Sequence, residues 1–594
     1  MTPTRRLARL FLGTTLLACA TAVRAMDTSS PTAATVAAPL PSGDRDGIPD
    51  QLAPAQASAY RSIFAAIHAQ RWSDAQAGIA GAGDGLLTPI ARAELYLAKS
   101  SPRVELTSLM DLIARAPELP EAAQLELLAK KRGADTLPDI PQERDLVSYK
   151  GAPSRVSAVS ASDAAGVALS NQIVPLLKAD QPTAAEAALT SAQAQLAPEA
   201  RTEWQQRISW SYYLNGDDAD AARMAQLARG GAGQWAAQAD WVAGLAAWRR
   251  GDCKAAGDAF GSVAGRALDS EMRAAGLFWA ARADMACGRP QLVQARLRTA
   301  ARIPETFYGL LAARTLSLPV SSKATMPTLG TDEWSRISSY PNIRVAAALA
   351  EIGEYSLADE VVRHQAKIGP DSDHGALLHL AARLDLPATQ IWLAKNAPAG
   401  TQPDMAARYP VPSWTPQGGW RVDKALVYAH ALQESQFRTD AVSPAGAWGV
   451  LQVLPSTANL IEKKRGGAPV QKSALVDPRV NLDYAQSYLQ QLAAAVETGG
   501  LLPKVIAAYN AGPKNVVKWN TAGAAAADPL LYIESIPFKE TRGYVAAVLR
   551  NYWMYDRQTG ESASSLKAIA QGLWPRFPGI QGTTAMSGLG GGGH

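Results

Sequence analysis

The sequence predicts an all-α protein built from a superhelical array of helical hairpins, a helical linker region and a separate C-terminal α domain. Residues 56–400 are rich in alanine and leucine at helical spacing, with almost no alternation of β-branched residues. A degenerate repeat, in which each copy contains a glycine, runs through this part of the chain. Beyond it, residues 397–420 are rich in proline, which cannot sustain a helix and marks a domain junction.

The repeat predicts helix pairs that end and restart at glycines. Gly216, Gly251 and Gly288 are separated by 35 and 37 residues, and Gly353 lies in a fourth copy. A glycine after the last helical residue adopts the left-handed conformation that stops a helix. Hairpins of this period stack because one pair cannot bury its own apolar face, so the array is expected to be curved or ring-like. Generic helical packing with chance glycines is the alternative interpretation.

The order of segments follows from composition. We expect a signal peptide (1–25), a flexible segment (26–55), the α-superhelical domain (56–303), a helical linker domain (304–400), the proline-rich junction (401–420), a compact domain (421–576) and a flexible tail (577–594). Within the array, residues 133–165 concentrate proline, glycine, serine and charge, and predict a long loop or linker.

The first residues predict export. Arginines precede an apolar run from Leu10 to Val23, which is followed by a small-residue cleavage site at Val23–Ala25. The alternative is a lipobox at Leu16–Cys19, which would leave a lipidated Cys19 on an outer-membrane lipoprotein. The apolar run is shorter than the ~20 residues needed to span a bilayer. We therefore expect a periplasmic protein.

Charge and cysteine content narrow the function classes. The 594 residues are 47% hydrophobic and 19% charged, with a net charge of +5, and the leader carries four of the arginines and no acid. The remaining +1 gives no electrostatic support for nucleic-acid binding. Cys253 and Cys287 lie in equivalent places of successive hairpins, 34 residues apart, and export favours a disulfide over two free thiols. The sequence indicates no metal site and no cofactor.

The C-terminal domain begins with a candidate acid. A helix from Val422 to Phe437 places Glu434 on one face with Val427 and Phe437. Burial beside apolar groups raises the pKa of a carboxyl and suits a general acid. An ordinary solvated glutamate is the alternative reading of this helix alone.

Three later stretches carry further polar candidates. Ser443 and Gln452, in a glycine-rich turn, are neutral hydrogen-bond formers suited to fixing a sugar or its acetamido group, although both could simply cap turns. Tyr509 and Asn510 lie at a helix end before Gly512. The last stretch brings together Glu534, Glu540, Arg542 and Tyr544, in which Glu540 and Arg542 could form a structural ion pair.

Four motifs in this order resemble the soluble lytic murein transglycosylases, glycoside hydrolase family 23, whose catalytic domain is similar to goose-type lysozyme. The family's Glu-Ser, Gly-Leu-Met-Gln, Ala-Tyr-Asn-Ala-Gly and Ile-Pro-Phe-x-Glu-Thr-Arg-x-Tyr-Val patterns appear at 434–435, 449–452, 508–512 and 536–545. The resemblance extends to 277–283 and 306–316, at the end of the family's helical ring. His430, Leu432 and Leu451 depart from the residues that members often carry.

The resemblance implies a C-terminal lysozyme-like domain and a peptidoglycan substrate. Glu434 would cleave the bond between N-acetylmuramic acid and N-acetylglucosamine and leave 1,6-anhydro ends, with Ser443, Gln452, Tyr509, Asn510, Glu540 and Tyr544 binding the glycan strand. A monomer is expected, and partners in cell-wall synthesis or secretion stay unidentified. Two alternatives remain. A second carboxylate, Glu534 or Glu540, would make the protein a hydrolytic lysozyme, and a degenerate site would make it a non-catalytic helical-repeat scaffold.

Overall fold

The described part of the chain is helical almost throughout. The structure, a computed structural model, describes residues 48–160, 163–231, 233–318, 328–401, 405–520, 527–560 and 563–579. These residues form 27 α-helices and one short ribbon, in which β1 (Val147–Ser148) pairs antiparallel with β2 (Asn396–Ala397). The all-α prediction is confirmed. The expected signal peptide, most of 26–55 and the tail beyond 579 lie outside the described residues.

The N-terminal helices pack with the middle of the chain rather than with the helices that follow them. Buried apolar side chains of both groups form one continuous core. The first group is α1 (Pro54–His68), α2 (Trp72–Ala82), α3 (Thr88–Leu97), α4 (Leu106–Arg115) and α5 (Ala122–Lys131). The second is α15 (Thr331–Ile337), α16 (Pro341–Ile352), α17 (Tyr355–Ile368), α18 (His374–Arg383) and α19 (Pro387–Lys395). The range 56–303, predicted as one array, is therefore divided between two cores.

The flexible segment expected at 26–55 ends earlier than predicted. Ile48 and Leu52 are buried in the N-terminal core. The backbone N–H groups of Gln51 and Leu52 donate hydrogen bonds to the carboxylate of Glu351, at 2.6 and 3.2 Å. These contacts fix residues 48–53 against α16. The composition of the segment could not predict them, because the partner residues lie about 300 positions away in the sequence.

The helices between these two groups in the sequence form the regular stack that the repeat predicts. Each helix of this group packs against the next one along the chain. They are α6 (Ala164–Lys178), α7 (Pro182–Ala192), α8 (Pro198–Leu214), α9 (Asp218–Arg229), α10 (Gln234–Arg249), α11 (Cys253–Arg266), α12 (Ser270–Ala286) and α13 (Pro290–Ala301). Gly216, Gly251 and Gly288 adopt φ of 85°, 74° and 66°, and Gly353 adopts 91° between α16 and α17. The left-handed glycines of the repeat are confirmed.

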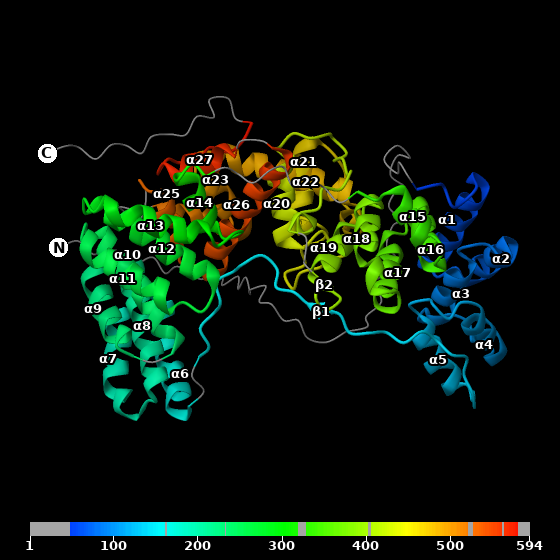
Figure 1. Ribbon diagram of the computed structural model, residues 1–594, viewed down its shortest axis with the longest axis horizontal. Helices are drawn as coiled ribbons and strands as arrows, with labels where there is room; N and C mark the ends of the chain where they lie inside the picture. Colours follow the sequence, from blue (N-terminus) through cyan, green and yellow to red (C-terminus); the bar gives the residue numbers. More distant parts are fainter. Residues whose placement is uncertain are drawn as a thin grey trace, which may run out of the picture.

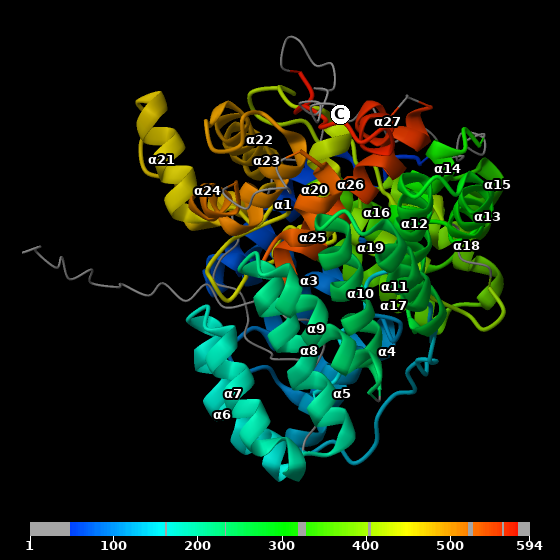
Figure 2. The same ribbon diagram turned by 90° about the vertical axis from the view of Figure 1, so that its left-hand side faces the viewer.

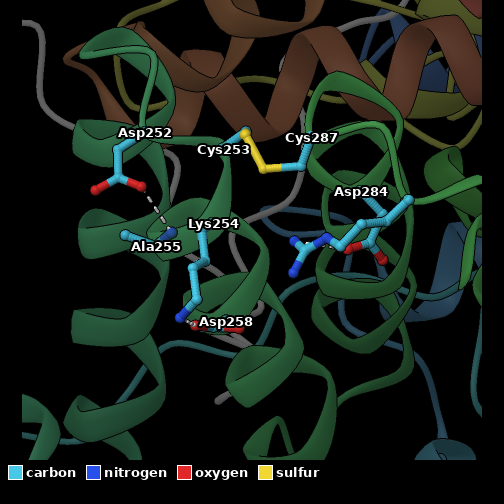
Figure 3. Close-up of a disulfide and its surroundings, with 8 residues drawn as sticks. Asp252, Cys253, Lys254, Ala255, Asp258, Asp284 and Cys287 are labelled. Atoms are coloured by element: carbon cyan, nitrogen blue, oxygen red, sulfur yellow. Dashed lines mark hydrogen bonds and ion pairs between the residues drawn. A yellow bond between two sulfur atoms is a disulfide. The ribbon is translucent and has the colours of Figure 1, made fainter.

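A disulfide joins two neighbouring hairpins of this stack. Cys253 at the start of α11 and Cys287 at the end of α12 are bonded, with their Cα atoms 5.6 Å apart (Figure 3). Asp252 caps α11 by accepting a hydrogen bond from the N–H of Ala255 at 2.9 Å. The bond ties the junction between α10 and α11 to the junction between α12 and α13.

The C-terminal domain shares its core with the stack. It contains α20 (Lys424–Glu434), α21 (Pro455–Arg465), α22 (Pro478–Ala494), α23 (Leu502–Ala511), α24 (Pro513–Asn520), α25 (Pro529–Ser535), α26 (Lys539–Thr559) and α27 (Ser564–Ala570). The helix α14 (Phe307–Thr315) packs on α26 and α27, where Phe307 stacks on Trp553 with ring centres 5.0 Å apart. Single 3-10 turns lie at Gln193–Gln195, Asp371–Asp373, Ala406–Arg408 and Lys472–Val476.

The stack and the N-terminal helices lie at opposite ends of the molecule, with the C-terminal domain above and between them (Figure 1). Residues 133–160 cross from one end to the other as an extended connection, consistent with the linker predicted there (Figures 1 and 2). Among the described helices, none is both long and apolar enough to cross a membrane.

Candidate active site

The helix α20 presents Glu434 as its last residue. Asp423 caps its start by accepting hydrogen bonds from the N–H groups of Ala425 and Leu426. The helix was expected to continue to Phe437 but ends three residues earlier, because Gln436 and Phe437 take left-handed φ values of 54° and 63°. This reversal buries the Phe437 ring in the core and leaves Glu434 at the helix end.

Glu434 is half-buried and has one neutral hydrogen-bond partner. The hydroxyl of Tyr544, on α26, donates to its Oε1 at 2.6 Å. Burial raises the pKa of Glu434 to about 7; the bond from Tyr544 lowers it and the charge of Glu540 raises it further. A carboxyl with this pKa carries a proton at near-neutral pH and can also release it, as a general acid and base must.

The glycine-rich turn after α20 is fixed directly beside this glutamate. The hydroxyl of Ser435 donates to the carbonyl of Val450 at 2.8 Å. Asn481, fully buried on α22, accepts from the N–H of Leu451 at 2.9 Å and donates to the carbonyl of Trp448 at 2.8 Å. At Gly449, whose φ is 73°, a Cβ atom would lie 2.3 Å from the carbonyl oxygen of Leu475, so only glycine fits.

Ser443 and Gln452 both stabilise this turn and keep part of their hydrogen-bonding capacity. The Oγ of Ser443 accepts from the N–H of Ala447 at 3.0 Å, and its hydroxyl proton is not used in that bond. The Nε2 of Gln452 donates to the carbonyls of Ala441 and Gly449 at 3.1 and 2.8 Å. No described residue donates to its Oε1. The capping role that the sequence left open is real, and it leaves one polar group of each side chain for a ligand.

Tyr509 and Asn510 lie near the end of α23, as predicted. The hydroxyl of Tyr509 donates to the carbonyl of Leu451 at 2.8 Å, which joins the third motif to the second. The centre of its ring lies 4.8 Å from the centre of the His430 ring on α20. The Oδ1 of Asn510 accepts from the hydroxyl of Thr541 at 2.6 Å, which leaves its amide N–H groups for other partners. The four motifs therefore meet around Glu434.

The charged residues of the last stretch, which contains Glu534, Glu540 and Arg542, lie in different places. Glu534 on α25 is only 2% exposed; Arg155 donates two hydrogen bonds to it at 2.7 and 2.8 Å, and the hydroxyl of Tyr308 donates a third at 2.7 Å. Glu540 is exposed in the first turn of α26. The suggested ion pair between Glu540 and Arg542 is wrong: Arg542 donates to the carbonyl of Ile536 and lies over the Trp210 ring at 4.5 Å.

Sequence reasoning missed three residues that build this region. Asn481 holds the turn through Leu451, which lies 30 residues away in the sequence. Arg155 holds Glu534, which lies 379 residues away. Neither residue lies in a recognisable motif. The sequence marks His430 only as a departure from the family pattern, yet its Nδ1 lies 2.8 Å from the hydroxyl of Tyr544. The described residues contain no group of three or more histidine, cysteine, aspartate or glutamate side chains arranged to hold a metal ion.

Comparison with known sequences places the C-terminal domain in a family. Residues 415–530 match the family model described as Transglycosylase SLT domain. The soluble lytic murein transglycosylase of Escherichia coli K12 is 36% identical over 155 residues, which cover 25% of this chain and 23% of that protein. The membrane-bound lytic murein transglycosylase C of Mannheimia succiniciproducens is 35% identical over 105 residues, 16% of this chain and 29% of that protein. The matches thus span about a quarter of the relatives' length.

Solved structures extend the likeness to the architecture. The 70 kDa soluble lytic transglycosylase of E. coli aligns with 88% of this chain and 99% of its own, at a TM-score of 0.53 and 17% identity. An inactive mutant of the lytic transglycosylase Slt of Pseudomonas aeruginosa aligns with 85% of this chain and 73% of its own, at a TM-score of 0.52 and 20% identity. At this identity the likeness concerns the fold, an α-superhelical assembly with a C-terminal helical domain.

Proposed function

We propose that this chain, whose C-terminal domain belongs to the transglycosylase SLT family, is a lytic transglycosylase that cleaves peptidoglycan glycan strands. The bond cleaved would be that between N-acetylmuramic acid and N-acetylglucosamine, and the product would carry 1,6-anhydro-muramic ends. The family of the domain and the names of its relatives support the substrate class.

The observation that carries the proposal is the contrast between two glutamates. Glu434 is half-buried, bonded to a neutral tyrosine, and has a pKa raised to about 7. Glu534, one of two candidates for a second carboxylate, is enclosed with Arg155 and Tyr308. Ordinary glycosidases use two carboxyl groups across the scissile bond. Among the described candidates, Glu434 is the half-buried carboxyl that no cation pairs with, and a single carboxyl of this kind suits a reaction in which the substrate supplies its own nucleophile.

In the proposed mechanism one carboxyl acts twice. Protonated Glu434 gives its proton to the glycosidic oxygen as the bond from that oxygen to the anomeric carbon breaks. The resulting carboxylate then takes the proton of the muramic 6-hydroxyl, whose oxygen bonds to the anomeric carbon and closes the anhydro ring. No water is consumed, and the enzyme ends with Glu434 protonated again.

The free polar groups around Glu434 fit the recognition of a sugar. The hydroxyl of Ser443 and the amide N–H groups of Asn510 can donate, and the Oε1 of Gln452 can accept. Tyr509, whose hydroxyl is held by Leu451, offers its ring edge and oxygen. We propose that these groups orient the acetamido and hydroxyl groups of the strand, and that exposed Glu540 borders the same site.

The remaining expectations also stay proposals. Export to the periplasm agrees with the Cys253–Cys287 disulfide, since such bonds form in oxidising compartments. The stack of α6 to α13 would cradle long strands next to the C-terminal domain, in a monomeric protein. Lipidation at Cys19 is the alternative for its attachment.

The test is mass spectrometry of the muropeptides that the full chain releases from purified peptidoglycan. We expect anhydro-muramic ends, lighter by one water than hydrolysed ends. Glu434→Gln keeps the side-chain shape and should lower release about 10²–10⁴-fold or more, because the general acid is lost. Glu540→Gln tests the other candidate carboxylate, and anhydro ends should persist, because closure of the anhydro ring needs no second carboxyl.

Two results would overturn the proposal. Reducing muramic ends, lost in Glu540→Gln, would identify a hydrolytic lysozyme in which Glu540 activates water. No release by the wild-type chain, from peptidoglycan that a control enzyme digests, would favour the non-catalytic scaffold.

A further inference from the structure

His430 is a fully buried histidine directly behind the candidate catalytic glutamate. It lies one helical turn before Glu434 on α20 and has no solvent exposure. Its Nδ1 lies 2.8 Å from the hydroxyl oxygen of Tyr544, whose proton is donated to Glu434 Oε1 at 2.6 Å. Its Nε2 is buried and has no hydrogen-bond partner among the described residues. The three side chains form one hydrogen-bonded chain that ends at His430.

The direction of these bonds follows from counting protons. A tyrosine hydroxyl has one proton, and an ionised carboxylate can only accept. When Tyr544 donates to Glu434, its oxygen must accept from His430, so the imidazole proton is on Nδ1 and Nε2 carries the lone pair. Burial lowers the pKa of His430 to about 3, which keeps the ring neutral. A neutral ring has one N–H group, and the hydrogen bond to Tyr544 uses it.

We propose that His430 is a positioning residue, which fixes the hydroxyl proton of Tyr544 on Glu434 by donating its own Nδ1–H to the tyrosine oxygen. The inference rests on the proposed function, because it assigns a role in that reaction. With Oε1 held as an acceptor, the transferable proton of Glu434 belongs on Oε2. The hydrogen bonds from His430 to Tyr544 and from Tyr544 to Glu434 therefore select which carboxyl oxygen delivers the proton to the glycosidic bond.

The surroundings of His430 leave Tyr544 as its hydrogen-bond partner. Tyr509 of α23 packs against the ring face, and Tyr488 of α22 lies behind Tyr509, with ring centres 5.5 Å apart. Burial raises the pKa of both tyrosines, so they are neutral. The carboxylates near these hydrogen bonds are Glu434 itself and exposed Glu540. No described cation or anion pairs with the ring, so its tautomer responds to Tyr544.

The first test observes the tautomer and needs no activity. Ring ¹⁵N shifts of the full chain, labelled at histidine, distinguish a protonated Nδ1 from a protonated Nε2, and His430→Asn assigns the signal. We expect the Nδ1–H form in the wild-type chain above pH 7, where Glu434 is ionised. We expect loss of that preference in Tyr544→Phe. An Nε2–H ring in the wild-type chain would overturn the inference and leave the proposed function standing.

The second test uses substitutions that differ in where they place a donor. The amide nitrogen of asparagine can occupy the position of Nδ1, that of glutamine reaches the position of Nε2, and leucine has no donor. We expect His430→Leu and His430→Gln to lower kcat about tenfold with little change in KM, as loss of one hydrogen bond to an active-site group implies. His430→Asn should recover most of the loss. Thermal unfolding of all three variants identifies any that fail to fold.

The outcomes separate the two hypotheses. Equal kcat in His430→Leu, His430→Asn and the wild-type chain would overturn the positioning role. Equal loss in all three variants at unchanged stability would also overturn it, because the ring would then act by its shape. No release of anhydro ends by the wild-type chain would overturn the proposed function itself, whatever the tautomer.

Discussion

Glu434 and Glu534 are two glutamates of one domain with opposite environments. Glu434 ends α20, is half-buried and meets the neutral hydroxyl of Tyr544. Glu534 is almost fully buried on α25, where Arg155 binds both of its carboxylate oxygens. Arg155 comes from the extended connection that crosses beneath the domain, and it also lies over the ring of Trp241 at 4.8 Å.

The partner of a glutamate, more than its burial, decides what the carboxyl can do. A guanidinium that binds both oxygens keeps a carboxylate charged and fixed in place. A neutral donor holds one oxygen and leaves the carboxyl free to bind and release a proton near pH 7. Glu534 therefore belongs to the interface that joins the stack, the connection and the C-terminal domain, whereas Glu434 has the environment that the proposed general acid and base needs.

Removing Arg155 should have the largest effect, because it takes away the cation that pairs with Glu534. Arg155→Met leaves Glu534 charged and buried, and we expect it to lower the free energy of unfolding by about 3–5 kcal/mol. The measurement is the unfolding transition of the full chain. Arg155→Met combined with Glu534→Met should recover much of the loss, because no unpaired charge remains. Below the transition temperature Arg155→Met should still release anhydro ends, since Arg155 does not contact Glu434.

Arg71→Met is the matched control for that prediction. Arg71 pairs with Asp74 at 2.6 Å, and both side chains are 55% exposed. Exposed pairs contribute about 0–1 kcal/mol. A loss in Arg155→Met as small as that in Arg71→Met would contradict a structural role for the buried pair.

A third glutamate, Glu121, is buried with neither a cation nor a side-chain donor beside its carboxyl among the described residues. Both carboxylate oxygens of Glu121, before α5, are buried, and no other described residue donates a hydrogen bond to them; the backbone N–H of Glu121 itself lowers the pKa of this carboxyl slightly. Burial, with the charges of Glu94 and Glu360, raises its pKa to about 8. The folded chain thus binds a proton that the unfolded chain has released at pH above about 4.3. Its stability should fall as pH rises from about 4.3 to 8 and stay low above.

Glu121→Gln should remove that loss. We expect the variant to be more stable than the wild-type chain by several kcal/mol at pH 9, at most about 5 for a pKa that moves from about 4.3 to 8, and equally stable at pH 4, where Glu121 is neutral. Calorimetry at the two pH values measures the difference. Glu126→Gln changes a partly exposed glutamate of the same helix and should show no such pH dependence. A gain at pH 4 as large as at pH 9 would refute an ionisation effect.

The parts predicted from sequence depend on neighbours along the chain. The left-handed glycines of the repeat follow from local spacing. The meeting of the four motifs around Glu434 was implied by the family resemblance, not by spacing. The rest depends on partners far away in sequence: Arg155 for Glu534, Asn481 for the turn, and the N-terminal helices for α16 and α17. No periodicity encodes such pairs, because they form only when the tertiary fold closes.

The pH profile gives the smallest effect and the most direct view of Glu434. The general acid must be protonated before cleavage, so kcat/KM should fall about tenfold per pH unit above the pKa of about 7. The bond from Tyr544 favours the charged carboxylate and lowers this pKa. Tyr544→Phe should therefore move the alkaline limb upward, by about one pH unit for one hydrogen bond.

Tyr532→Phe is the control for Tyr544→Phe. Tyr532 lies in the same domain, and its buried hydroxyl has no hydrogen-bond partner among the described residues. Removing that hydroxyl should leave the alkaline limb in place. If the limb of Tyr544→Phe also overlays that of the wild-type chain, Glu434 is not the group that titrates. The contrast with Glu534 would then concern stability alone, because a carboxyl that does not set the pH limb is not the acid of the reaction.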